Sequence, residues 1–203
     1  MNEIQAIAVK PKQGGYTLVE LAIAVAILAV LIVAGLSGVQ SILTSGKVND
    51  QIKTVAKLSS KVSGSFNGTS SGTSGMTTSS LANLSFWDSS KVNAGAVTSS
   101  FGTSEFAKSN ANVVTDMAKN TGLVYAIAKV PSAACSDLAV GLSNIVYGIR
   151  IQKASITSET DTYPDASATV IEVKSAGGAI DPVKLGNGCG LGTQLDFFIA
   201  LKP

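Results

Sequence analysis

KPKQGGYTLVE (residues 10–20) runs directly into the apolar stretch LAIAVAILAVLIVAG (residues 21–35), and this junction decides the fold. Two lysines precede a pair of glycines, and Tyr16 then opens a run whose length and composition predict an apolar helix. Glu20 is its single charged residue. A carboxylate inside a membrane-length helix is costly without a partner. We therefore expect Glu20 to make a specific contact.

The residues GGYTLVEL (14–21) resemble the processing signal of type IV pilins. In that family a membrane peptidase cuts after the glycine, the new N-terminal amine is methylated, and a glutamate one turn into the mature chain is needed for assembly. The resemblance implies cleavage between Gly15 and Tyr16 and methylation of Tyr16. It also implies an assembly salt bridge between Glu20 and the Tyr16 amine of a neighbouring subunit. Tyr16 departs from the Phe or Met that is usual at the first mature position.

A second segment, VPSAACSDL (130–138), is similar to the region around the first cysteine of the PilS-like type IVb pilins. That similarity implies that Cys135 and Cys189 form a disulfide. An isolated cysteine pair in an exported chain also favours a disulfide on general grounds. The alternative is a pair of free buried thiols.

Two simpler interpretations of the N-terminus remain open. A secretory signal peptide has a basic start and an apolar stretch, but it would leave Glu20 inside a discarded segment. A plain membrane anchor needs about 20 apolar residues, which residues 16–35 supply, and it is compatible with a pilin. The lysines before Gly15 would place the N-terminus in the cytoplasm. For Glu20 itself, an acid in the first turn of a helix is favoured by the helix dipole.

Composition excludes several classes of function. The chain has no histidine, which rules out Ser-His-Asp and Cys-His catalysis and most zinc sites. The formal net charge of +2 provides no footprint for nucleic acid. The glycine-rich residues 186–192 are predicted to form a loop without a phosphate role. An acidic cluster in the second half offers at most a weak calcium site: Glu159, Asp161, Asp165 and Glu172. We therefore expect neither an enzyme nor a cofactor.

Three regions follow from the pattern: a leader (1–15), a hydrophobic helix for the membrane or the filament core (16–38), and a globular head (39–203). The head is predicted to begin with an amphipathic continuation of the same helix, because apolar residues recur at helical spacing: Val39, Ile42, Leu43, Ile52, Val55, Leu58 and Val62. Gly35 and Gly38 mark a place where the helix could bend or pack closely against another helix.

Beyond this helix the composition predicts a Ser/Thr/Gly-rich surface loop (63–80) and a return to the head that buries Trp87. A short helix is expected at 112–120 and another at 132–142. β-branched and aromatic runs bounded by turn residues predict strands at 123–130, 145–151, 168–173 and 196–201. The fold class is thus α+β: a long N-terminal helix packed on an antiparallel sheet, with a disulfide-bounded C-terminal region. The strand order is not readable from the sequence.

The predicted function is structural: the major subunit of a type IV pilus. Its expected partners are copies of itself in a helical filament, a prepilin peptidase, the inner-membrane assembly machinery and, before assembly, the membrane. The precursor would lie in the inner membrane and the filament on the cell surface, where such pili serve attachment, aggregation or conjugative mating contact. The alternatives are a minor pilin or a type II secretion pseudopilin, and, in a different class, a membrane-anchored periplasmic binding protein or enzyme.

Overall fold

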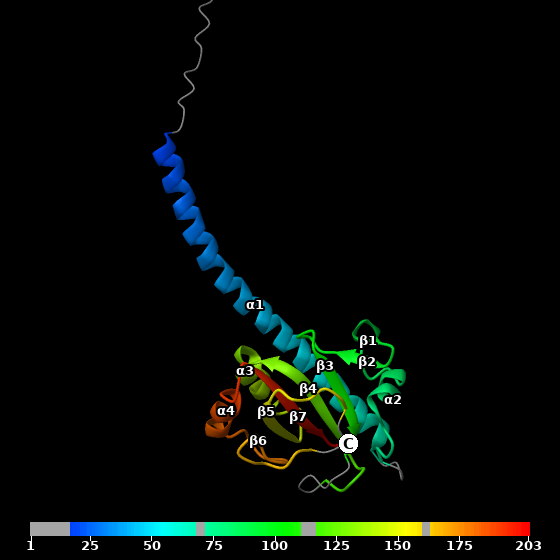
Figure 1. Cartoon of the computed structure of the whole chain (residues 1–203). Helices are drawn as coiled ribbons and strands as arrows, with labels where there is room; N and C mark the ends of the chain where they lie inside the picture. The colour runs from blue at the N-terminus through cyan, green and yellow to red at the C-terminus, as the bar shows by residue number, and fades with distance from the viewer. Residues whose placement is uncertain (1–16, 68–71, 111–116, 160–162) are drawn as a thin grey trace, which may run out of the picture. The chain divides into compact units, whose positions relative to one another are not determined.

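The computed structural model describes residues 17–67, 72–110, 117–159 and 163–203. The chain divides into two units, residues 1–42 and 43–203. The predicted boundaries at residues 15 and 38 stay predictions. The first unit is described by the N-terminal part of helix α1 (Leu18–Phe66), an uninterrupted helix that passes through Gly35 and Gly38. The second unit contains the remainder of α1 and every other element (Figure 1).

The second unit is built on a seven-stranded antiparallel sheet with the order β1-β2-β3-β4-β7-β5-β6. Besides α1, the described residues of this unit form three short α-helices and one 3-10 turn. Its strands are β1 (Val92–Asn93), β2 (Ala96–Thr98), β3 (Ser104–Ser109), β4 (Leu123–Pro131), β5 (Gly148–Lys153), β6 (Val170–Lys174) and β7 (Gln194–Leu201). The helices are α2 (Thr78–Asn83), η1 (Ser89–Lys91), α3 (Ser132–Leu142) and α4 (Pro182–Cys189).

Strand β4 shows why the sheet is buried on both faces. Leu123, Tyr125 and Ile127 point into the main core with α1 and α3, whereas the alternate residues Val124 and Ala126 enter a second apolar cluster. Because side chains alternate across a strand, the large residues face the thick helical layer. The small ones face a thin cover that includes Ile156 and Tyr163.

The part of α1 in this unit is held by an apolar stripe. Val48, Val55, Leu58 and Val62 are 0–3% exposed, and Phe66 is nearly buried. The predicted stripe is wrong at its start, where Val39, Ile42 and Leu43 are exposed. The buried face of the helix begins at Val48, with buried residues three or four positions apart. It also includes one polar residue, Gln51, which is fully buried.

Several predicted local elements are corrected by the structure. The helix continues to Phe66, so the predicted loop begins later, and Thr73 within it is fully buried. Most of the predicted helix at 112–120 lies outside the described residues, and its described end, 117–120, is not helical. The glycine-rich segment is not a loop throughout, since α4 extends to Cys189. The α+β class, the long helix and the antiparallel sheet are confirmed.

Helix α4 packs against strands β5 and β6, and this contact explains the glycine at position 188. An added Cβ at Gly188 would lie 3.4 Å from both Ile151 Cβ and Val173 Cγ2. These residues belong to β5 and β6, so glycine at this position lets α4 approach the sheet closely. A polar N-cap starts the helix: Asp181 accepts hydrogen bonds from the backbone N–H groups of Val183 and Lys184 at 2.9 and 3.1 Å.

Candidate functional site

Glu20 lies in the first turn of α1. Its backbone N–H donates to Thr17 Oγ1 at 3.3 Å, which is half of a capping box and begins the helix at Leu18. The Glu20 side chain is exposed, and none of the ion pairs found among the described residues includes it. Gly15 and Tyr16, the predicted cleavage and methylation positions, lie outside the described residues.

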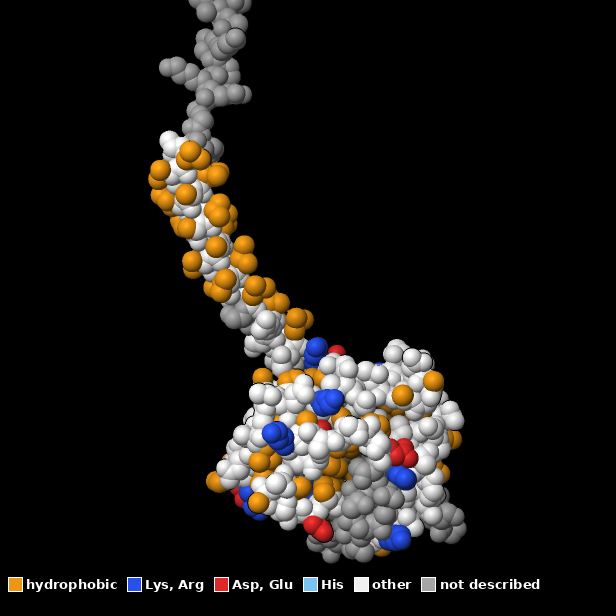
Figure 2. All heavy atoms as spheres, in the orientation of Figure 1, with side chains coloured by type: hydrophobic (Ala, Val, Ile, Leu, Met, Phe, Trp, Pro, Cys, Tyr) orange, Lys and Arg blue, Asp and Glu red, His pale blue; other side chains and the backbone are white. Residues whose placement is uncertain are grey.

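The helix that follows Glu20 exposes apolar side chains on every side. From Leu18 to Ile42 the large apolar residues are 53–87% exposed, and Figure 2 shows them covering the visible surface of this segment. By length and composition α1 could cross a membrane, with a mean hydropathy of 2.8 over its most apolar window. A buried core helix would pass the same test, but none of this window is buried within the chain. An outside partner must therefore cover this surface.

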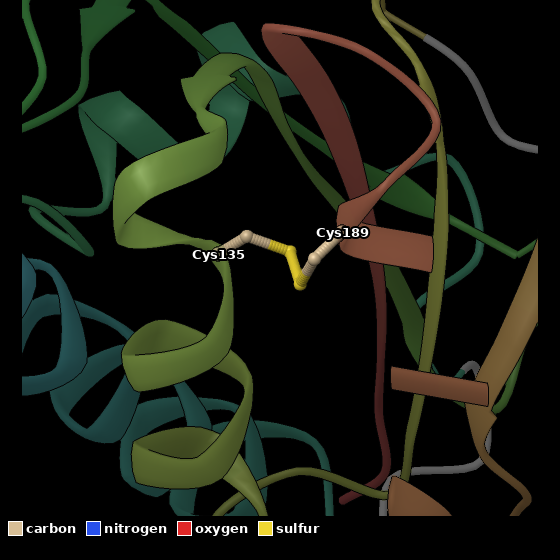
Figure 3. Close-up of a disulfide and its surroundings, with 2 residues drawn as sticks. All are labelled: Cys135 and Cys189. Atoms are coloured by element: carbon tan, nitrogen blue, oxygen red, sulfur yellow. A yellow bond between two sulfur atoms is a disulfide. The ribbon is translucent and has the colours of Figure 1, made fainter. Parts of the chain in front are cut away.

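A disulfide joins helices α3 and α4. Cys135, fully buried in α3, is bonded to Cys189 at the end of α4, with the Cα atoms 5.7 Å apart (Figure 3). The enclosed segment contains β5 and β6. The disulfide predicted from the resemblance is confirmed, and it bounds the C-terminal region as expected.

A buried polar network ties α1 to the sheet, and the sequence analysis missed it. Gln51 Nε2 donates to Glu105 Oε1 at 2.6 Å and to the Tyr125 hydroxyl at 3.0 Å, while Gln51 Oε1 accepts from the backbone N–H of Ser100 at 2.9 Å. Trp87 Nε1 donates to the other carboxylate oxygen of Glu105 at 2.9 Å. Trp87 is buried in the core as predicted, and its ring nitrogen also has this polar role.

The electrostatics of Glu105 reflect two opposing effects. Burial raises the pKa of this fully buried carboxyl, because a charge loses hydration there. Hydrogen bonds from Gln51, Tyr125 and Trp87 act in the opposite direction. The raised pKa shows that burial is the larger effect. The pKa of Tyr125 is also raised well above its ordinary range, first by burial and then by the neighbouring Glu105.

The predicted acidic cluster does not converge. Glu159 accepts from the backbone N–H of Thr78 at 2.9 Å and pairs with Lys108 at 3.7 Å, whereas Glu172 is paired with Arg150. Asp165 is almost fully exposed at 3.8 Å from Arg150, and Asp161 lies outside the described residues. Among the described residues no three metal-ligating side chains form a group. Of the described acids, Glu159 makes its own contacts, whereas Asp165 and Glu172 both pair with Arg150.

A comparison with known protein families finds a match at the N-terminus of the chain. Residues 10–36 match the family model described as the prokaryotic N-terminal methylation motif. The match includes Gly15, Tyr16 and Glu20 and extends through the exposed apolar helix. Among curated protein sequences, none matches this chain.

Comparison with solved structures concerns the fold. The crystal structure of TcpA, a type IV pilin from Vibrio cholerae El Tor biotype, superposes with a TM-score of 0.54 over 76% of this chain and 98% of that one, at 13% identity. This chain has the type IV pilin fold. A type IVb pilin from Salmonella typhi gives a TM-score of 0.45 over 74% of this chain and 97% of that one, at 15% identity. The predicted resemblance to type IV pilins is confirmed by the motif and the fold together.

Proposed function

We propose that this chain is the major subunit of a type IV pilus of the IVb kind. The proposal rests on three features that follow one another along the chain. The methylation motif at residues 10–36 covers a helix that leaves its apolar surface exposed, and the same chain continues into a head with the pilin fold. Such a helix needs lipid before assembly and other helices after it, and both surroundings are apolar.

Cleavage after Gly15 is the step that makes the subunit competent to assemble. A prepilin peptidase would release residues 1–15 and create an amine on Tyr16, which is then methylated. In the filament this amine pairs with Glu20 of a neighbour. Because the pair lies among apolar helices, removing one partner costs on the order of 3–5 kcal/mol at each contact. Hydrophobic burial changes little when the apolar helix moves from lipid into the filament. The salt bridge therefore supplies the specific contact that favours assembly.

The location of the subunit changes with its assembly state. The precursor is held in the inner membrane by its apolar helix, and the assembly machinery extracts it into a filament on the cell surface. The role is structural, not enzymatic. Attachment, aggregation and conjugative mating contact are the uses that such a filament would serve.

The proposal is tested on purified surface filaments. We expect their main protein to begin with N-methyl-Tyr16, as measured by N-terminal sequencing and intact mass. A minor pilin would be present in filaments at low stoichiometry, and an anchored enzyme or binding protein would form none. A main filament protein that begins at Met1, or that is a different chain, would overturn the proposal.

A pair of variants tests the role of Glu20. Glu20→Ala should be cleaved and retained in the membrane, because the peptidase site is intact, but it should be absent from filaments. Asp50→Ala is the matched control, since Asp50 is an exposed acid of the same helix whose contact is a surface pair with Lys53 at 3.6 Å. Filaments in normal amount from Glu20→Ala would contradict the assigned salt bridge.

A further inference from the structure

A cavity of about 380 Å³ opens where strand β4 bulges. We call it the bulge cavity. Its walls come from three separate parts of the head, all within residues 43–203: β2 and the start of β3, the bulge of β4, and the segment after β5. The residues that line it include Thr98, Ser104, Ala128, Lys129, Ile156 and Thr157.

The buried side chain of Asp196 holds two of these three parts in place by hydrogen bonds. Asp196 on β7 is fully buried, and its Oδ1 accepts from the backbone N–H of Lys129 at 2.9 Å. Its Oδ2 accepts from the N–H groups of Ser155 and Ile156 at 2.5 and 2.7 Å. The bulge and the segment after β5 are thus fixed to the same side chain. The cavity is a feature of the fold and not of a free loop.

Lys129 has a backbone conformation that disfavours a lysine. Its φ is +55°, in the left-handed region, where a side chain meets the following carbonyl and glycine does not. The other non-glycine residues with positive φ in the described chain, Ser85, Ala94 and Asn120, lie at turns or just after a helix. Lys129 lies within a strand. The bulge requires this φ, but glycine would supply it without strain, so the lysine side chain itself needs an explanation.

The groups around Lys129 indicate the chemistry of a ligand. The lysine is exposed, and none of the ion pairs of the described residues includes its ammonium group. Thr98, Ser104 and Thr157 bring hydroxyl groups that both donate and accept hydrogen bonds. Ala128 and Ile156 are buried and form an apolar floor. A cation, several hydroxyls and an apolar floor match a carboxylate, sugar hydroxyls and the C–H face of a sugar ring.

We propose that the bulge cavity binds a carboxylated sugar, with Lys129 at its carboxylate. The cavity is open to solvent on one side, and its volume of about 380 Å³ can hold a single sugar residue with one face left exposed. Residues in strained backbone conformations concentrate at ligand sites, where function outweighs the loss of stability. The proposal concerns the head alone and does not depend on filament formation.

The test uses the full chain in detergent, titrated with N-acetylneuraminate and glucuronate and followed by ligand-observed NMR. N-acetylglucosamine is the neutral comparison and inorganic phosphate the comparison for a bare anion. We expect the two acidic sugars to bind and the neutral sugar and phosphate to bind at least about tenfold more weakly, as expected for the loss of a charged hydrogen bond or of the sugar contacts. If the acidic sugars do not bind, or if phosphate binds equally well, the assignment to a sugar is wrong.

Lys129→Gly separates binding from folding. It keeps the required φ and removes the ammonium group. We expect the thermal midpoint to rise by about 2–4 °C and the affinity for acidic sugars to fall about tenfold or more. Lys129→Arg, which keeps the charge, should retain binding, and Lys53→Ala on exposed α1 should leave it unchanged. Unchanged affinity in Lys129→Gly would overturn the assignment of Lys129 to the carboxylate.

Discussion

Gln51→Leu is the sharpest test of the contact between α1 and the sheet. Gln51 occupies a position of the apolar stripe that leucine would fill with little change of volume, and the substitution removes only its polar groups. Three hydrogen bonds are lost: those to Glu105 and Tyr125, and the one from the backbone of Ser100. The Ser100 N–H and one oxygen of the buried Glu105 are left without these partners.

The expected loss of stability follows from those contacts. A hydrogen bond to a charged group contributes about 1.5–3 kcal/mol and a neutral one about 0.5–1.5 kcal/mol. The added apolar burial of leucine offsets about 1 kcal/mol. We therefore expect Gln51→Leu to lower the free energy of unfolding by about 2–4 kcal/mol, a large share of the 5–15 kcal/mol typical of a domain.

Trp87 provides the assay. It is the single tryptophan of the chain, it is buried, and it donates to Glu105, so its fluorescence reports on this network directly. Urea unfolding of the oxidised full chain in detergent would be compared with Asp50→Asn. That control removes an exposed pair one residue away and should cost less than about 0.5 kcal/mol. A Gln51→Leu loss no larger than the control's would refute this account of the network.

Two further predictions concern the head. The pKa of Glu105 in the folded state lies above its ordinary value of 4.5, so the folded protein holds this proton more tightly than the unfolded chain does. This difference stabilises the fold at pH values below 4.5, and the stabilisation is lost as the pH rises through the folded pKa. The Glu105→Gln variant cannot titrate at this position, so the difference in free energy of unfolding between it and the wild type should shrink as the pH rises through the folded pKa of Glu105. Urea titrations at a series of pH values check the sign, and a difference that grows with pH would be incompatible with it. Replacing Cys135 and Cys189 together by alanine opens a loop with a sequence separation of 54 and should cost about 4 kcal/mol in the same urea assay; a loss below about 1 kcal/mol would show that the bond adds little constraint.

The long helix and the late strands were predictable because their signals are local. Hydropathy and spacing define α1, and β-branched runs define β4 to β7 within a few residues. Strands β1 and β2 were missed because they are only two and three residues long. Strand β3 was missed because Glu, Ala and Lys, which are depleted in strands, make up half of its six residues. Helix α4 was missed because its glycines suggested a loop, although Asp181 followed by Pro182 is a common way to begin a helix.

The polar interior could not have been predicted in the same way. Glu105 and Tyr125 lie 54 and 74 residues from Gln51 in the sequence, and only the sheet register brings them together. Asp196 likewise acts on Lys129 and Ser155 from a strand far along the chain. The spacing 48, 51, 55, 58 and 62 would have placed Gln51 on the buried face. It would not have identified the partners of its amide.

A polar residue at such a position has a consequence for how α1 docks. Val48, Val55, Leu58 and Val62 supply apolar burial, but apolar side chains of similar size can pack in more than one register. Moving α1 by one turn would place Val48 or Val55 opposite the buried carboxylate of Glu105 and leave it without the Gln51 amide. Because a buried carboxyl oxygen that loses its hydrogen bond is unfavourable, such shifted arrangements are penalised. The apolar stripe therefore supplies most of the stabilisation, and the Gln51–Glu105 contact selects the register in which α1 lies on the sheet.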